Sequence, residues 1–369
     1  MNKKLFLLLL ILFLQFTNIG FAQETSIQFP RLDFHMKMNQ NLKPSISYNA
    51  EANIVVGDKS GLVFSLGVNG EDLNLQSGLN DLIKLDTLKL SISPSSTFNF
   101  HTFYGRYKYL GEDKVIPRGF QYNYTPGSDY YGYKSLEGAG LAFSFPIQEG
   151  RYEPELVLYS DSNNGIDYLN IDLLTTFRFE LWNLELYGGV AIPTIGAVST
   201  AIKGHGGLSI YTTLEYANVY FALYVPSHFG EVFSFDDIYF RLSQYVLIRG
   251  FEQTFSITSL GAESGNTSDP LVGFNSIPDI NMFLSLGGRI NNIGFGVDYG
   301  LVYGIFESNS LVNDALTISH RIGAYADAVF LGLTYKLGVF YTMPNSFVYI
   351  NDSTAPGEMG FYVSVFGRS

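Results

Sequence analysis

Apolar and polar side chains alternate in short segments along most of the chain. In residues 169–181 the odd-numbered positions are apolar apart from Thr175, whereas Asn170, Asp172 and Arg178 lie among the even-numbered ones. A period of two predicts β-strands with one apolar and one polar face, and no helical period fits these segments. The same alternation predicts further strands within 31–38, 45–56, 208–216, 219–225, 237–248, 293–303, 318–328 and 331–341.

Tight and long connections alternate between the predicted strands. Asn291-Asn292 favours a two-residue hairpin because asparagine tolerates a positive φ. Ile290 should then pair with Ile293, and Gly288 should face Phe295 on the outer surface. The other tight turns are expected at 57–60, 182–183, 217–218 and near 329–330, and the long connections at 69–96, 125–136, 193–207, 226–236, 261–280, 306–316 and 342–357.

The composition is unusual for a water-soluble domain. Only 15% of the 369 residues are charged and 46% are hydrophobic, whereas soluble domains have about 25% charged residues. With 31 Phe and 26 Tyr the chain is too aromatic to be disordered, and its net charge of −12 disfavours nucleic acid as a partner. The absence of cysteine excludes disulfides and thiolate metal sites.

A membrane-embedded β-barrel reconciles the alternation with this composition. After the first segment no run approaches the length of about 18 apolar residues that a spanning helix needs. A closed barrel is the other structure that satisfies the backbone inside a bilayer. The polar faces carry mostly Ser, Thr, Asn, Gly and Tyr, which suits a crowded lumen better than bulk water. A soluble β-protein is the alternative.

The fold class predicted is all-β: a transmembrane, antiparallel, up-and-down β-barrel. Up to about 18 segments alternate, and setting aside the weakest ones (Leu62–Val68, Arg118–Tyr124 and Glu155–Ser160) leaves about 14 to 16. Because bacterial barrels have even strand numbers, we expect about 16 strands, short periplasmic turns and longer extracellular loops. No change in composition divides residues 23–369, which should form one domain.

The first 22 residues have the three regions of a secretory signal peptide. Asn2-Lys3-Lys4 is basic, residues 5–16 are apolar apart from Gln15, and Gly20-Phe21-Ala22 is a small-x-small cleavage site. The apolar region is too short for a spanning helix. We expect cleavage after Ala22 and export. Removal of Lys3 and Lys4 leaves 20 basic against 34 acidic residues, and hence a net charge of −14.

The C-terminal segment resembles the β-signal of bacterial outer-membrane proteins. It consists of a polar residue, a glycine two positions later, and alternating hydrophobic residues that end at an aromatic one: Glu358, Gly360, Val363, Val365 and Phe366. This resemblance implies an outer-membrane location, recognition by the barrel-assembly machinery, and a last strand that closes the barrel against the first. The extra Gly367-Arg368-Ser369 departs from the pattern, in which the chain often stops at the aromatic residue.

Candidate catalytic and metal-binding motifs are weak, so we predict no enzyme and no cofactor. Ser227 and His228 are adjacent in an expected loop, where neighbouring side chains point apart. The chain has neither a Gly-x-Ser-x-Gly nor a His-Glu-x-x-His motif. His205 should be a polar loop residue, because no second His or Cys lies at metal-ligand spacing. Partners are instead expected to be outer-membrane lipids and a small-molecule solute.

Charged residues on the polar faces should point into the lumen. Mixed charges there can pair and fill the interior, or they can set the selectivity of a passage. With a turn at Trp182-Asn183, Glu180 should lie opposite Glu185 and bias conduction toward cations unless Arg178 neutralises the pair. The lumen-facing charges predicted are Glu51, Asp172, Arg178, Glu180, Glu185, Glu215, Arg241, Arg321 and Asp327, with Arg31, Asp33, Lys37, Asp237, Arg289, Asp298 and Lys336 on the same faces.

Two classes of function remain open at this stage. The first is a porin-like channel or a transporter for small or apolar solutes. The second is a non-transporting barrel, either structural or a surface receptor or adhesin that acts through the loops 69–96 and 261–280. Strand-type alternation begins near Arg31, which leaves no room for a large N-terminal plug and disfavours energised import of large ligands. The sequence does not identify a solute.

Overall fold

The computed structural model describes residues 25–39, 44–56, 62–70, 84–113, 115, 134–163, 166–194, 202–228, 238–260, 279–306, 315–330, 332–343 and 358–367. These residues form antiparallel strands, and none of them forms a helix long and apolar enough to cross a membrane. The strands are β1 (Thr25–Asn39), β2 (Pro44–Val56), β3 (Leu62–Gly70), β4 (Lys84–Ser95), β5 (Phe98–Leu110), β6 (Lys134–Ser144), β7 (Tyr152–Asn163), β8 (Ile166–Arg178), β9 (Trp182–Pro193), β10 (Lys203–Thr213), β11 (Ala217–His228), β12 (Tyr239–Ile248), β13 (Phe251–Leu260), β14 (Asp279–Ile290), β15 (Ile293–Phe306), β16 (Ala315–Phe330), β17 (Leu333–Met343) and β18 (Glu358–Gly367).

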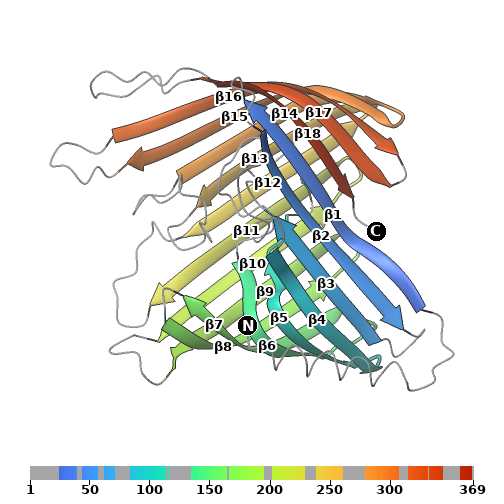
Figure 1. Ribbon diagram of the computed structural model, residues 1–369, viewed down its shortest axis with the longest axis vertical. Helices are drawn as coiled ribbons and strands as arrows, with labels where there is room; N and C mark the ends of the chain where they lie inside the picture. The colour runs from blue at the N-terminus through green and yellow to red at the C-terminus, as the bar shows by residue number, and fades with distance from the viewer. Residues whose placement is uncertain are drawn as a thin grey trace.

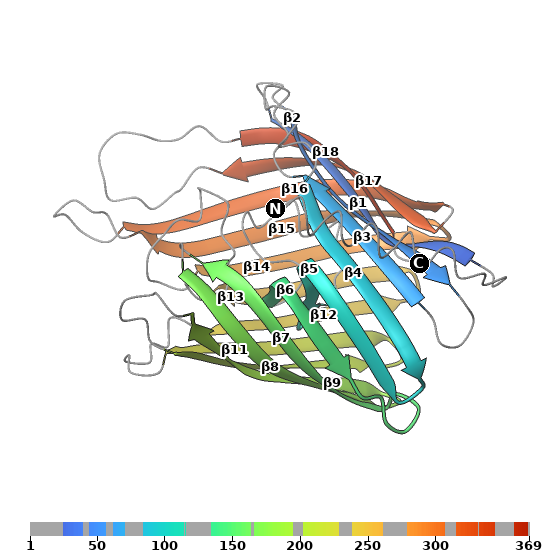
Figure 2. The ribbon, with the colours of Figure 1, turned by 60° about the horizontal axis from the view of Figure 1, so that its bottom comes forward.

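The described strands close into a barrel of 18 strands, with β1 beside β18 (Figure 1). Each strand pairs with its neighbours in the chain, and β1 pairs with β18 from Leu32↔Gly367 to Asn39↔Gly360. Figures 1 and 2 show that β14 to β17 lie across the barrel from β4 to β9. The antiparallel, up-and-down topology predicted from the alternation is confirmed.

The strand number is higher than the expected 16, because two discarded segments are strands. Leu62–Val68 lies within β3, and Glu155–Ser160 lies within β7. In β7 the inward positions Val157 and Tyr159 are apolar and buried, so the contrast between the two faces is weak. The segment Arg118–Tyr124 lies outside the described residues.

One predicted long loop, 69–96, contains the strand β4. Gly67 pairs with Thr87 but Val68 pairs with Leu85, so Asp86 is an extra residue at a β-bulge. The bulge shifts the period by one position and interrupts the alternation that would otherwise mark the strand.

Short and long connections alternate, as predicted. The end of the barrel where β1 begins and β18 ends, here called the turn end, has the connections 57–61, 96–97, 145–151, 179–181, 214–216, 249–250, 291–292 and 331–332. The opposite, loop end has the longest ones, such as 111–133, 261–278 and 344–357, and also the short connections 40–43 and 164–165.

The Asn291-Asn292 hairpin forms as predicted. Ile290 pairs with Ile293, Gly288 pairs with Phe295, and Asn291 has a φ of 54°. A Cβ atom on Gly288 would lie 3.3 Å from the Phe295 ring, which therefore covers this part of the outer surface. Two other turns were predicted two positions too late: Glu180-Leu181 and Glu215-Tyr216 occupy the tips instead of 182–183 and 217–218. Phe330 pairs with Leu333, so the turn expected near 329–330 lies two positions later.

The two faces of the wall differ as the alternation predicted. In β8, Leu169, Ile171 and Leu173 are exposed on the outer face, whereas Asn170 and Asp172 are buried on the inner face. A soluble monomer rarely exposes a continuous apolar surface of this kind. The outer face therefore fits contact with lipid.

Candidate functional site

A segment that follows β5 runs into the barrel interior; we call Gly111–Asp113 together with Val115 the interior segment. The amide of Gly111 donates a hydrogen bond of 2.6 Å to Glu185 Oε1 on β9. The hydroxyl of Tyr220 on β11 donates to the carbonyl of Gly111. Val115 is buried. The interior segment therefore contacts strands that are far from β5 around the wall.

Asp113 anchors this segment to β12. Its Oδ2 atom lies 2.9 Å from Arg241 Nε and accepts a 2.6 Å hydrogen bond from Ser243 Oγ. Its Oδ1 atom accepts a 2.8 Å bond from the amide of Val115. Asp113 and Arg241 are both almost fully buried. A buried ion pair is stable only when further hydrogen bonds compensate for lost hydration, and Asp113 meets that condition.

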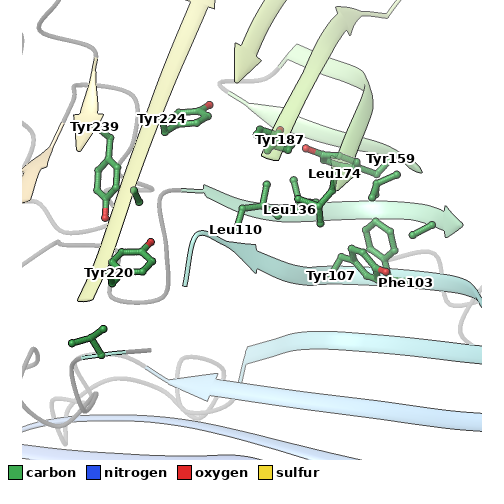
Figure 3. Close-up of a cluster of buried hydrophobic side chains, with 14 of the residues drawn as sticks. Phe103, Tyr107, Leu110, Leu136, Tyr159, Leu174, Tyr187, Tyr220, Tyr224 and Tyr239 are labelled. Atoms are coloured by element: carbon green, nitrogen blue, oxygen red, sulfur yellow. The ribbon is translucent and has the colours of Figure 1, made fainter. Parts of the chain in front are cut away.

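Val115 of the interior segment belongs to a cluster of buried side chains, part of which is drawn in Figure 3. Phe103 stacks on Tyr107 with ring centroids 4.7 Å apart, and Leu110 and Leu136 are completely buried. Tyr220, Tyr224 and Tyr239 cover the β11 and β12 side of the same cluster. Large side chains at inward positions thus fill much of the interior along β5 to β12, and we call this the filled side.

A second polar cluster on the filled side joins β7, β8, β9 and β10. His205 Nε2 lies 2.8 Å from Asp172 Oδ1, and the hydroxyls of Tyr159 and Tyr187 each donate a 3.0 Å bond to Asp172 Oδ2. His205 stacks on Tyr187, and Lys134 Nζ lies 3.2 Å from its Nε2 atom. His205 is therefore an inward-facing residue of β10, and the prediction that it lies in a loop is wrong.

The strands β13 to β18 have a different inner surface, which we call the glycine side. Gly287 and Gly296 are register partners, and Cβ atoms on them would each lie 2.7 Å from the Tyr325 hydroxyl. The Tyr362 ring covers Gly338 in the same way, and the Phe340 ring covers Gly360. Because glycine has no side chain, these rings lie against the wall and do not extend across the interior.

Charged residues on the glycine side form a chain of ion pairs. Arg289 bridges Glu252 at 2.5 Å and Asp327 at 2.7 Å. Lys336 Nζ lies 3.5 Å from Asp298 Oδ2 and 3.9 Å from the centre of the Tyr325 ring. The Arg289 side chain remains 25% exposed, in contrast to the buried Lys336. This chain therefore presents a partly accessible guanidinium to the interior.

The structure places six of the nine main predicted charges along the inner wall. Asp172, Arg241 and Asp327 are buried there, and Glu185 bonds the interior segment. Glu51 is half-buried, and Arg321 lies over the Phe340 ring at 4.7 Å. Asp237 and the side chains of Arg31, Asp33 and Lys37 lie outside the described residues.

The other three predicted lumenal charges lie at the turn end. Glu180 and Glu215 are exposed in turns, and Arg178 is a half-exposed rim residue that pairs with Glu153 at 2.8 Å. Glu185 pairs in register with Thr176 and does not face Glu180. The expected carboxylate pair does not exist, because the tip of the turn lies two residues earlier than predicted. The cation bias that depended on this pair has no structural basis.

The residues that resemble a β-signal form the last strand. Gly360 pairs with Asn39 of β1 and with Phe340 of β17, while Val363 and Val365 pair with Met36 and Phe34. Phe366 pairs with Asp33 and Thr334, and Glu358 pairs with Thr342. The prediction that this strand closes the barrel against the first is confirmed. Its recognition by assembly machinery stays a prediction.

Sequence reasoning missed the residues that hold the interior segment. Asp113 and Tyr220 were not singled out, because a connecting segment gives no periodic signal and tyrosine suits either face of a strand. The one available signal for this segment was the stretch Gly111-Glu112-Asp113, which directly follows the alternating run of β5. Among the described residues, no group of three His, Cys, Asp or Glu is placed to hold a metal ion.

Comparisons with known proteins bear on the fold. No protein-family model matches the chain, and no curated protein matches it. A variant of OccD1 (OprD) matches with a TM-score of 0.53 at 10% identity, over 94% of this chain and 96% of that one. Acinetobacter baumannii OccAB4 matches with a TM-score of 0.51 at 12% identity, over 94% and 99% of the two chains. Pseudomonas aeruginosa OccD3 (OpdP) matches with a TM-score of 0.51 at 11% identity, over 93% and 91%. The chain therefore has the fold of these porin-like outer-membrane β-barrels.

Proposed function

We propose that this protein is an outer-membrane channel that passes small solutes through a lumen narrowed by the interior segment. The observation that carries the proposal is the anchoring of that segment by Asp113 to Arg241 and Ser243. A buried anchor holds the segment inside the barrel, where it restricts the cross-section of the lumen.

The number of strands supports a passage. Barrels of about 16 to 18 strands are wide enough to enclose an aqueous channel, whereas about eight strands leave an interior that side chains fill. Here the filled side takes up part of that width. The path is proposed to run along the glycine side, where rings lie against the wall and Arg289 is partly accessible.

The residues that line the path favour the passage of small polar solutes, with no strong selectivity for cations or for anions. Arg289 and Lys336 are each held by carboxylates of the same wall. Because charges of both signs are paired, the lining presents hydrogen-bonding groups more than a net field. We propose no catalytic activity: Asp172 and His205 engage one another and two tyrosines, and their role is to join β7, β8, β9 and β10.

The proposal includes export, with cleavage after Ala22, and insertion by barrel-assembly machinery that recognises β18. Outer-membrane lipids would cover the exposed apolar face. These steps are supported by the basic and apolar start of the sequence, by the alternation of β18 and by the outward Leu169, Ile171 and Leu173. Fractionation with N-terminal sequencing of the mature protein tests them together.

The channel proposal is tested with refolded mature protein in planar bilayers and in liposomes. We expect discrete conductance steps, and liposome swelling with small neutral sugars that stops at larger ones. The double variant Asp113→Asn with Arg241→Gln removes both buried charges and should raise the conductance and the size limit. A correctly folded wild type and double variant that both conduct nothing would overturn the channel and favour a structural barrel or receptor.

A further inference from the structure

A cleft of about 1120 Å³ lies at the turn end, between the turn 145–151 and the turn after β8. We call it the rim cleft. Its lining comes from both turns and from the strand residues beside them: Ile147, Gln148, Arg151, Tyr152, Phe177, Arg178, Phe179, Glu180, Leu181 and Trp182. None of these residues takes part in the proposed solute path.

Backbone contacts hold the two turns against each other. The amide of Arg178 donates a 2.7 Å hydrogen bond to the carbonyl of Arg151, and Arg178 Nη1 donates a 2.6 Å bond to the carbonyl of Gly150. Ile147 forms an isolated bridge with Tyr152, which narrows the first turn. The cleft is therefore a defined feature of the wall.

One wall of the rim cleft is aromatic and continuous with the outer, lipid-facing surface. Tyr152 and Phe177 contact each other with ring centroids 5.0 Å apart, and Phe179 stacks on Trp182 at 4.1 Å. Trp182 is the one tryptophan of the sequence. Tryptophan and other aromatic residues at the border of a barrel's apolar band mark the level of lipid headgroups. The rim cleft therefore lies where headgroups and the first acyl carbons meet.

The polar edge of the rim cleft carries charges of both signs. Arg178 pairs with Glu153, which is outside the lining, and remains half-exposed. The exposed Arg151 side chain makes no ion pair with any described residue. Glu180 is the single carboxylate of the lining, and Glu149 lies outside it, in the turn 145–151. Arg178 shares its guanidinium with Glu153 and the Gly150 carbonyl. Arg151 beside Glu180 then complements a ligand that has an anion next to a cation.

We propose that the rim cleft binds a phospholipid with an ethanolamine headgroup. Arg151 and Arg178 hold the phosphate, Glu180 accepts from the ammonium, and the upper acyl carbons contact Phe177 and Leu181. The primary ammonium fits because it has three N–H donors for Glu180, which a quaternary choline group lacks. This inference rests on the membrane location in the proposed function but not on conduction.

Native mass spectrometry of the refolded mature protein tests the proposal. The protein is mixed in detergent with equal amounts of dioleoyl phosphatidylethanolamine, phosphatidylglycerol and phosphatidylcholine. We expect the ethanolamine lipid to be retained preferentially. Arg151→Gln should lower its retention about fivefold, the effect of one arginine near a lipid surface. Arg249→Gln, an exposed arginine in the β12–β13 turn, is the matched control and should change nothing.

A second variant separates the lipid from other anions. Glu180→Gln should lower retention of the ethanolamine lipid and leave that of phosphatidylglycerol unchanged or raised. Equal retention of all three lipids by the wild type, or equal loss in Arg151→Gln and Arg249→Gln, would overturn the proposal. Full displacement by inorganic phosphate at millimolar concentration would overturn it too, because the aromatic wall would then contribute nothing. Conductance should be the same in all these variants, so a failed channel and an empty rim cleft give different results.

Discussion

The filled side and the glycine side of the barrel share one outer surface but differ within. Along β5 to β12 the inward positions carry large side chains, such as Tyr187 and Tyr220, together with the interior segment. Along β13 to β18 they include glycines such as Gly287, and the rings of Tyr325 and Tyr362 lie against the wall. The same period of two therefore builds both kinds of wall. The inner surface is crowded where the inward positions carry large side chains, and it is flat where many of them are glycine.

The largest expected effect comes from breaking one buried ion pair on each side. Asp113→Asn leaves Arg241 without its carboxylate, and Asp298→Asn does the same to Lys336. Removal of one partner of a buried pair costs about 3 to 5 kcal/mol, so both variants should unfold at lower urea concentration in detergent. Only Asp113→Asn should raise the single-channel conductance, because Asp113 anchors the interior segment and Asp298 does not contact it. A larger conductance in Asp298→Asn would place the restriction on the glycine side.

A charged residue on the outer face should lower the free energy of unfolding equally on the filled side and on the glycine side. Leu173 on β8 and Val339 on β17 are 56% and 57% exposed near the middle of their strands. Arginine at either position should destabilise the barrel by about 2 to 4 kcal/mol near the bilayer midplane, as measured by unfolding in lipid vesicles. Thr176→Arg, on the inner face of β8, is the control and should cost much less. If Thr176→Arg were the more damaging variant, the register of β8 would be shifted by one residue.

The glycine side should be sensitive to a single methyl group. A Cβ atom at Gly296 would lie 2.6 Å from the Leu286 carbonyl oxygen and 2.7 Å from the Tyr325 hydroxyl. Gly296→Ala should therefore cost about 1 to 3 kcal/mol, as overpacking does. Gly188→Ala places its methyl group 3.9 Å from the nearest atom, on the outer face of β9, and should be neutral or slightly stabilising. Equal unfolding midpoints for the two variants would show that the rings are not packed on the wall.

The smallest effect distinguishes two glutamates near the β8–β9 turn. Glu185→Ala removes the acceptor for the Gly111 amide and should cost about 1 to 2 kcal/mol, because a buried donor loses its partner. Glu180→Ala, in the exposed turn, should leave the free energy of unfolding unchanged. If both variants destabilised equally, Glu180 would have a contact inside the barrel, as the turn at Trp182-Asn183 had predicted.

The wall was predictable from the sequence because its two environments repeat at every second residue. Leu169, Ile171 and Leu173 are outward as predicted, and Asn291-Asn292 forms the expected turn because asparagine adopts the positive φ required there. The prediction failed where the period gave a weak signal. Asp86 sits at a bulge that hides β4, and apolar Val157 and Tyr159 on the inner face hide β7.

The interior was less predictable, because it depends on contacts between residues far apart in the chain. Parity placed Asp172, Arg241 and Asp327 on the inner wall, but nothing in the sequence pairs Arg241 with Asp113. The turn after β8 was misplaced because Trp182 and Asn183 suit a turn as well as a strand end, and the Glu180–Glu185 prediction failed with it. Local patterns therefore show which face of a strand a residue occupies. Which residue it contacts across the lumen depends on closure of the whole barrel.

The pairing of β1 with β18 also bears on how the protein is made. Every other strand pair joins neighbours in the chain, so each hairpin can form as soon as its second strand is synthesised. Asp33 and Phe366, which are partners in the closing pair, stand near opposite ends of the described chain. Until β18 arrives, β1 and the newest strand are open edges whose unpaired N–H and C=O groups can recruit strands of other molecules. A chain truncated before Glu358 would lack the closing strand and would therefore be an aggregation hazard.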